Sequence, residues 1–289
     1  MSVASPVRPT SRPRPATSGA GRAPAIALGA LLAAGAVYWI AIWTAPGQLV
    51  DQYVLDVMRY SPATGDLPHL LGIEAITDPR VWLVTALLGA AGALYGAVRG
   101  RLTVGAGLLR VGALLAFPPV IAALSRFLRD VVLVRPHLHD WIGETSNSAP
   151  SGHAAAASAA VVVLTAATAP RLRPVVLAFG ATWVSVIGVG LIAAGWHRPS
   201  DVVISMLIVV GLGVGLPDPY GPAAPAAGGI LGRLGVVGTA VVATPLITAT
   251  VYEGPRQVLT AAALAGLIGL GLALYRPCRY AGRGRFAGR

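Results

Sequence analysis

The sequence contains little charge, and it lacks what a soluble domain needs to cover its surface. Only 11% of the residues are charged and 55% are hydrophobic, with a mean hydropathy of +0.70. Soluble domains carry about 25% charged residues, so this composition excludes an ordinary globular protein in water and predicts lipid as the solvent. Lysine is absent, and all 22 basic residues are arginine.

Cysteine is also scarce: Cys278 is the only one, which excludes an intrachain disulfide and indicates a reduced cytoplasmic thiol. The formal net charge of +11 is concentrated at the ends, with four arginines in the first 23 residues and five in the last 14. A nucleic-acid-binding module would need a folded basic face, so we expect no nucleic-acid partner. We expect a disordered basic tail over 1–24, which is not a cleavable signal, and a basic tail over 276–289, both cytoplasmic.

Hydrophobic runs long enough to span a bilayer recur eight times, near 25–45, 81–98, 104–125, 152–169, 174–195, 201–216, 234–252 and 257–275. These runs predict an all-α fold, a polytopic transmembrane helical bundle. A Pro- and Gly-rich stretch predicts a flexible cytoplasmic linker over 217–233. It separates a six-span core, 25–216, from an additional transmembrane hairpin, 234–275.

Charges in the connections predict which side of the membrane each lies on. The inner connections contain arginines, namely Arg99 and Arg101, Arg171 and Arg173, and Arg233. Of the 11 acidic residues only Asp218 falls inside, and the arginine bias puts both termini in the cytoplasm. In the first outer connection, about 46–80, apolar residues recur at helical spacing. They predict an amphipathic helix, either in the membrane interface or packed on the bundle.

Three groups of polar residues lie at span ends that share the outer face. The first is an arginine cluster, Arg126, Arg129 and Arg135, suited to forked hydrogen bonds with phosphate oxygens. The second is Pro150-Ser151-Gly152-His153 at a helix N-terminus, where free backbone N–H groups favour an anion. The third pairs His197 with Asp201, four residues apart, so that the carboxylate can orient the imidazole.

The order Arg-Pro, Pro-Ser-Gly-His and His-x-x-x-Asp over residues 125–205 resembles the signature of the type 2 phosphatidic acid phosphatase family. Lipid phosphate phosphatases, bacterial polyprenyl-diphosphate phosphatases and vanadium haloperoxidases share it. Two positions depart from the family pattern. Leu128 stands where the family has lysine, with Arg129 beside it as the replacement, and Gly190-Leu191 stand where it has Ser-Arg.

The resemblance implies a phosphatase of lipid phosphates in the plasma membrane, with an extracytoplasmic site and no cofactor or metal. By this similarity His197 attacks phosphorus to form a phosphohistidine, Asp201 holds its tautomer, and His153 serves as acid and then base. The residues expected to bind phosphate are Arg129, Arg135, Ser151, Gly152 and Arg198. Phosphatidate-type lipids and polyprenyl diphosphates are both possible substrates, and the oligomeric state is open.

Three alternatives accompany this interpretation. A phosphotransferase of the same architecture would pass the phosphate to an acceptor lipid instead of water. A transporter or non-catalytic scaffold would explain the missing Ser-Arg at Gly190-Leu191. A metal site formed by His137, His139 and Asp140 is the third, although that spacing is loose.

Overall fold

The computed structural model describes residues 22–59, 78–99, 102–143, 146–220, 229–249, 252 and 254–277. Most of both predicted tails, residues 1–21 and 278–289, lies outside these ranges, and so does Cys278. The described chain is all helical. Its helices are α1 (Arg22–Trp43), α2 (Ala45–Arg59), α4 (Pro79–Arg99), α5 (Val104–Phe127), α6 (Gly152–Ala167), α7 (Arg173–Ala193), α8 (Pro199–Gly213), α9 (Ile230–Ile247) and α10 (Pro255–Leu274), with short turns η3 (Leu128–Val132) and η4 (Pro170–Leu172).

The predicted polytopic helical bundle is confirmed, because each of the eight apolar runs coincides with a helix. Six helices in the described part are long and apolar enough to cross a membrane, namely α1, α4, α5 with η3, α7, α9 and α10. Helices α6 and α8 are apolar but shorter. Helices satisfy every backbone hydrogen bond internally, which the hydrocarbon interior requires.

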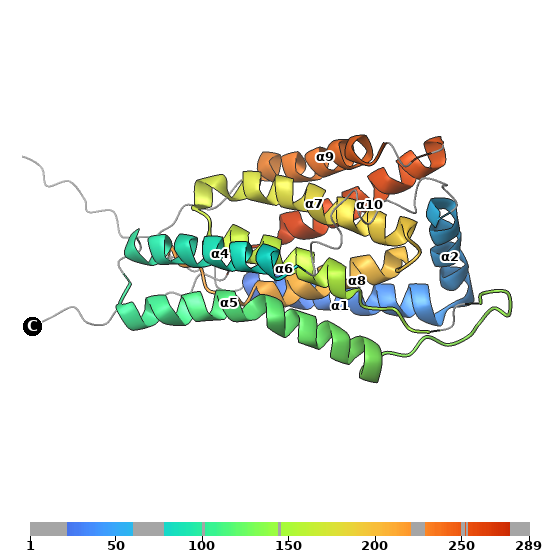
Figure 1. The fold of residues 1–289 in the computed structure, drawn as a ribbon, viewed down its shortest axis with the longest axis horizontal. Helices are drawn as coiled ribbons and strands as arrows, with labels where there is room; N and C mark the ends of the chain where they lie inside the picture. Colours follow the sequence, from blue (N-terminus) through green and yellow to red (C-terminus); the bar gives the residue numbers. More distant parts are fainter. Residues whose placement is uncertain are drawn as a thin grey trace, which may run out of the picture.

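Helix α6 lies at the centre of the bundle and packs against α4, α5, α7 and α8 (Figure 1). Almost all of its residues are buried alanine, serine, threonine and valine. Small side chains let neighbouring backbones approach closely, which drives helix packing in lipid. At Gly180 of α7, an added Cβ would lie only 2.4 Å from the Val161 side chain of α6. Closely packed small residues therefore keep the centre rigid.

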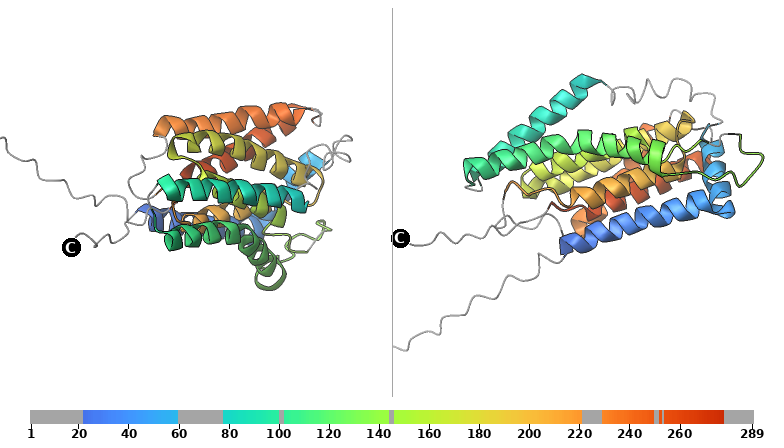
Figure 2. Two further views of the ribbon diagram at one scale, coloured as in Figure 1. Left: turned by 60° about the vertical axis from the view of Figure 1, so that its left-hand side comes forward. Right: turned by 90° about the horizontal axis from the view of Figure 1, so that it is seen from below.

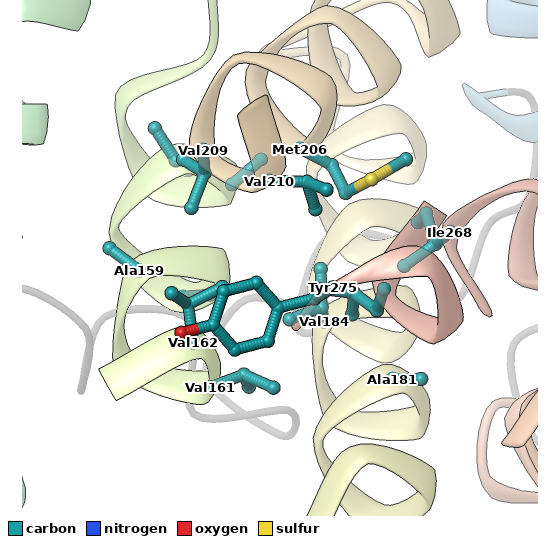
Figure 3. Close-up of a cluster of buried hydrophobic side chains, with 14 of the residues drawn as sticks. Ala159, Val161, Val162, Ala181, Val184, Met206, Val209, Val210, Ile268 and Tyr275 are labelled. Carbon is teal, nitrogen blue, oxygen red and sulfur yellow. The ribbon is translucent and has the colours of Figure 1, made fainter. Parts of the chain in front are cut away.

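The last two helices pack into the same bundle. Helix α9 packs against α7 and α10, and α10 also packs against α8. Tyr275, just after α10, places its ring among Val162, Val184 and Val210, which come from α6, α7 and α8 (Figure 3). The predicted hairpin thus shares one hydrophobic core with the six preceding spans.

A buried ion pair holds the end of the bundle at which α6 ends and α7 begins. Both Nη atoms of Arg173 donate to the Asp218 carboxylate, at 2.8 and 2.7 Å, and both side chains are almost fully buried. Arg173 also donates to the carbonyls of Ala166 and Thr168. Within the predicted linker 217–233, Asp218 is anchored in this way and α9 begins at Ile230, whereas residues 221–228 lie outside the described ranges.

Helix α2 lies across the opposite end of the bundle, almost perpendicular to α1 (Figures 1 and 2). It occupies the first part of the predicted amphipathic segment, and residues 60–77 are not described. Its buried residues are Gln48, Asp51, Leu55 and Met58, spaced three or four apart on one helical face. This face covers the end of the bundle at which α6 and α8 begin.

Candidate active site

The predicted site residues gather at the end of the bundle that α2 crosses. Helices α6 and α8 both begin there, and their first turns are joined directly: the Ser151 N–H donates to the Asp201 carbonyl at 3.3 Å. The Ser205 hydroxyl lies 3.0 Å from the Ser151 carbonyl and adds a second link. These bonds fix the second and third motifs relative to one another.

His197 and Asp201 form the predicted pair. The His197 Nδ1 lies 3.4 Å from Asp201 Oδ2, and the carboxylate is fully buried. The same oxygen accepts the Ser148 hydroxyl at 2.6 Å and the Arg198 N–H at 2.9 Å. Because Nδ1 faces the carboxylate, Nε2 is the ring nitrogen placed for reaction. Ser148 precedes the second motif by two residues, and no motif in the sequence indicates its contact with Asp201.

The turn before His197 depends on glycine. Gly195 has a φ of +74°, a left-handed conformation that a side chain disfavours. A Cβ there would also lie 2.8 Å from Nε of Arg59 at the end of α2. The Leu191 carbonyl accepts the N–H groups of Trp196 and His197, at 3.0 and 3.3 Å. Leu191, the departure from the family pattern, is thus a buried residue whose backbone holds this turn.

His153 faces the same region from the first turn of α6. Its ring lies 5.9 Å from the ring of Trp196, the neighbour of His197 in the chain, at an interplanar angle of 41°. His153 is within electrostatic range of both His197 and Arg129. The structure therefore brings the two predicted histidines to one place, with an arginine beside them.

Ser151, one of the residues predicted to contact phosphate, caps helix α6 in the structure. It is fully buried, and its Oγ accepts the Ala154 N–H at 3.3 Å as the N-cap of α6. Its own N–H is bonded to the Asp201 carbonyl. Gly152, the first residue of α6, lines the cavity described below.

Arg129 reaches the N-terminus of α6 from the π-helical turn η3. The Leu133 N–H donates to the Leu128 carbonyl five residues back, at 2.7 Å, and such turns often redirect side chains at functional sites. Nη1 of Arg129 lies 4.0 Å from the point where a Cβ of Gly152 would be. Asn147 Nδ2 donates to the Arg129, Leu133 and Ala149 carbonyls and fixes this turn to the following loop.

Arg135 is buried, and the described protein leaves its guanidinium without hydrogen bonds at Nη1 and Nη2. Asp51 Oδ2 is 3.8 Å from Nη2, close enough for an ion pair but too far for a hydrogen bond. Burial lowers the pKa of this guanidinium, which still stays charged. Donors buried without partners are costly, so this guanidinium is a candidate to bind an anionic ligand.

Arg198 lies on the α2 side of the site. It is almost fully buried, and its Nε and Nη2 donate to Gln52 Oε1 at 3.2 and 3.1 Å. Sequence reasoning missed the contributions of α2, namely Gln48, Asp51 and Gln52. Their spacing on the polar face of the predicted amphipathic helix was the available signal, but nothing in the sequence specified where that face would point.

The alternative metal-binding group is not assembled. His139 Nε2 lies 2.8 Å from the Ala45 carbonyl, and its ring contacts Trp141. Within the described ranges no three histidine, cysteine, aspartate or glutamate side chains gather as metal ligands. His139 instead joins the loop after η3 to the beginning of α2.

A cavity of about 560 Å³ lies between α4, α5 and α6. Arg126, Arg129 and His153 line one end of it. The remaining wall is largely apolar and includes Trp82, Leu114, Leu115, Pro118, Ala122 and Ala156. From His153 to Val163, another lining residue, the cavity follows α6 for about 15 Å at 1.5 Å per residue.

The fold and site define a polytopic helical membrane protein with two histidines and buried arginines at one end of the bundle. Residues 118–217 match the model of the PAP2 superfamily, which supports a type 2 phosphatidic acid phosphatase-like family for this segment and, with the apolar helices, fits a membrane phosphatase. No curated protein and no solved structure matched the chain. The matched segment runs from the second half of α5 to the end of α8 and leaves out α1, α2, α4, α9 and α10.

Proposed function

We propose that this protein hydrolyses a phosphomonoester or diphosphate of an amphiphilic lipid through a phosphohistidine intermediate. The cavity carries the proposal, because guanidinium and imidazole groups line one end and apolar side chains line the rest. A lipid phosphate has the same division into an anionic head and a hydrocarbon tail. Its tail would stay in apolar surroundings while its phosphate meets Arg129 and His153, so binding exposes no hydrocarbon to water.

In the proposed reaction Nε2 of His197 attacks phosphorus, and the bond from phosphorus to the leaving oxygen breaks. His153 donates a proton to that oxygen, which leaves as an alcohol or a phosphate. His153 then takes a proton from water, the water oxygen attacks phosphorus, and the P–N bond breaks to release inorganic phosphate. Asp201 stabilises the imidazole tautomer required for attack.

Three groups would neutralise the phosphate oxygens as charge shifts: Arg129, the unpaired Nη atoms of Arg135, and the N-terminus of α6 at Gly152. Arg198 is a further arginine beside the site, and its backbone N–H already bonds Asp201. We propose that its guanidinium supports the site from the α2 side, where the family's third-motif arginine is replaced by Leu191.

The charge pattern of the connections supports an extracytoplasmic site in the plasma membrane, with both termini cytoplasmic. Helix α1 begins, and helix α10 ends, on the side of the bundle that is remote from α2 (Figure 1). A substrate would enter laterally from the outer leaflet, between α4 and α5.

Assays of purified protein in detergent micelles test this function. We expect phosphate release from phosphatidate, phosphatidylglycerophosphate or a polyprenyl diphosphate, and a labelled phosphoenzyme on rapid denaturing quench. Release should persist within about twofold in chelator, since the proposed steps use protein side chains alone. Transfer of label to an added acceptor lipid, without phosphate release, would instead establish the phosphotransferase. No turnover and no labelled enzyme on any of these lipids would support the scaffold alternative.

Filling the cavity tests its role as a tail site. Ala122→Phe adds a ring to the cavity wall, so KM for a long-chain lipid phosphate should rise about tenfold by displacing the tail. A short, water-soluble phosphate ester should be hydrolysed within about twofold of the wild-type rate. Ala123→Phe makes the same change one residue along α5, outside the cavity lining, and should leave both substrates unaffected. An equal response of both variants would refute the tail site.

A further inference from the structure

Helix α2 has an unusual orientation for an amphipathic helix at a membrane surface. Its polar residues Gln48 and Asp51 are buried against the protein, whereas Val50 and Tyr53 are 62% and 56% exposed. An amphipathic helix on the surface of a water-soluble protein would instead bury its apolar residues and expose its polar ones. In its first half α2 therefore turns Val50 and Tyr53 outward and its polar residues toward the candidate active site, whereas Leu55 and Met58 of its second half are buried on the same face as Asp51. The helix lies outside the segment that matches the family model.

Asp51 is the central residue of this polar side. Its Oδ1 accepts the Ser200 N–H at 3.0 Å, and its Oδ2 accepts the Ser200 hydroxyl at 2.6 Å. Ser200 lies in the first turn of α8, between His197 and Asp201. Through Ser200, Asp51 fixes the position of the turn that carries the nucleophile and its carboxylate.

Asp51 also faces Arg135 on the other side. The distance of 3.8 Å from Oδ2 to Nη2 allows electrostatic attraction but leaves the N–H groups of the guanidinium uncommitted. Attraction of this kind fixes the direction of a side chain while its donors remain available. Asp201 also attracts this guanidinium, but in the described part of the chain Asp51 is the carboxylate that lies within ion-pair distance of it.

Two glutamines extend the contact. Gln48 Nε2 donates to the carbonyl of Pro136, which directly follows Arg135, and to that of Ile42, both at 2.7 Å. Gln52 Oε1 accepts from Arg198. One face of α2 thus contacts the loop of Arg135 and the first turn of α8.

We infer that α2 completes the phosphate site, and that Asp51 is a positioning residue that holds the Arg135 guanidinium toward the phosphate and steadies the turn bearing His197. The inference rests on the proposed function and extends it to a helix outside the matched segment. Asp51 itself touches neither substrate nor reacting atoms.

The positioning depends on the charge of Asp51, which changes in an accessible pH range. Burial raises the pKa of Asp51 to about 6, and the nearby Asp201 carboxylate adds to the rise, while the Ser200 bonds and Arg135 oppose it. Arg135 from the loop after η3 and Asp201 from α8 are the charged groups acting on it, and α10 contributes the neutral Gln257, bonded to the Val57 carbonyl. Above this pKa Asp51 is ionised and attracts Arg135; below it the attraction is lost.

Asp51→Asn tests the inference, because the amide keeps the shape and can still accept the Ser200 N–H. At pH 8 we expect kcat/KM of the variant to be about tenfold below that of the wild type. At pH 5, where Asp51 of the wild type is itself neutral, the two should agree within about twofold. The ratio cancels titrations common to both proteins, including those of His153, His197 and the substrate phosphate. A ratio that stays constant from pH 5 to 8 would show a purely structural role and overturn the inference.

Asp140→Asn is the matched control, since it makes the same change at an exposed position of the loop after η3, and its ratio to the wild type should be close to one throughout. Binding of inorganic phosphate to detergent-purified protein separates this inference from the proposed function. We expect the wild type to bind phosphate about tenfold more tightly than Asp51→Asn at pH 8. If the wild type binds phosphate in this way but hydrolyses no lipid phosphate, the inference stands and the function fails.

Equal or tighter phosphate binding by Asp51→Asn would overturn the inference, because removal of a negative charge beside the site would then outweigh any loss of positioning. Failure of the wild type to bind phosphate at all would overturn the inference, whereas phosphate release from lipid phosphates decides the proposed function. Normal hydrolysis with phosphate affinity independent of residue 51 would overturn the inference alone.

Discussion

Replacing His197 with alanine is expected to reduce lipid-phosphate hydrolysis by at least about a thousandfold, since the proposed nucleophile would be absent. The labelled phosphoenzyme should disappear in the same variant. Inorganic phosphate should still bind, because Arg135 and the N-terminus of α6 remain in place. Turnover, acid-quench labelling and phosphate binding on the purified protein measure these three quantities.

The protein should still fold and insert without the His197 side chain. That imidazole makes one long contact, 3.4 Å to Asp201, whereas Asp201 retains its bonds from Ser148 and from the Arg198 N–H. His137→Ala is the matched control, because it removes an exposed imidazole outside the described site, and its activity should match the wild type. Wild-type turnover in His197→Ala would disprove the phosphohistidine mechanism.

The largest expected effect on stability comes from the buried ion pair at the other end of the bundle. Asp218→Asn would leave the buried Arg173 guanidinium without its counter-charge, and breaking a buried pair in this way costs about 3–5 kcal/mol. The Tyr220 N–H also bonds Asp218 Oδ1, so the segment after α8 would lose an anchor. Unfolding of the detergent-purified protein by increasing SDS measures the change.

Replacing both partners gives the corresponding test of cause. In Arg173→Met with Asp218→Leu no charge is left buried, so most of the lost stability should return. Asp140→Asn should change stability by less than about 0.5 kcal/mol, as exposed substitutions usually do. If Asp218→Asn proves as stable as the wild type, the pair does not hold this end of the bundle.

The helices could be predicted because hydrocarbon permits few alternatives. A backbone in lipid must satisfy its own hydrogen bonds, so each long apolar run had to be a helix. The sequence was a poorer guide to local order where a segment is held by contacts within the protein and not by its burial in lipid. Asp218 lies within a Pro- and Gly-rich stretch that indicates flexibility, yet Arg173 reaches it from 45 residues away and orders it.

The same distinction applies to the site. His153, His197 and Asp201 were predictable because helix ends on one membrane face must meet and because their spacing is typical of the family. The sequence did not indicate that the Ser151 hydroxyl caps α6, because such a cap depends on local backbone geometry. Asp51 was not predicted as a site residue, because an amphipathic pattern predicts a polar helix face but does not say which residues that face contacts.

By itself the sequence predicted the membrane bundle, the gathering of His153 and His197 at one end of it and the kind of chemistry they favour, since hydropathy, connection charge and short motifs act locally along the chain. The tertiary structure alone decided that α2 turns its polar side to the site, that Arg135 keeps unpaired donors there, and that an apolar cavity adjoins His153. Those properties arise from contacts between residues far apart in sequence. Only such contacts remove a charged group from water, and the free-energy cost of burying it then has to be offset by a partner.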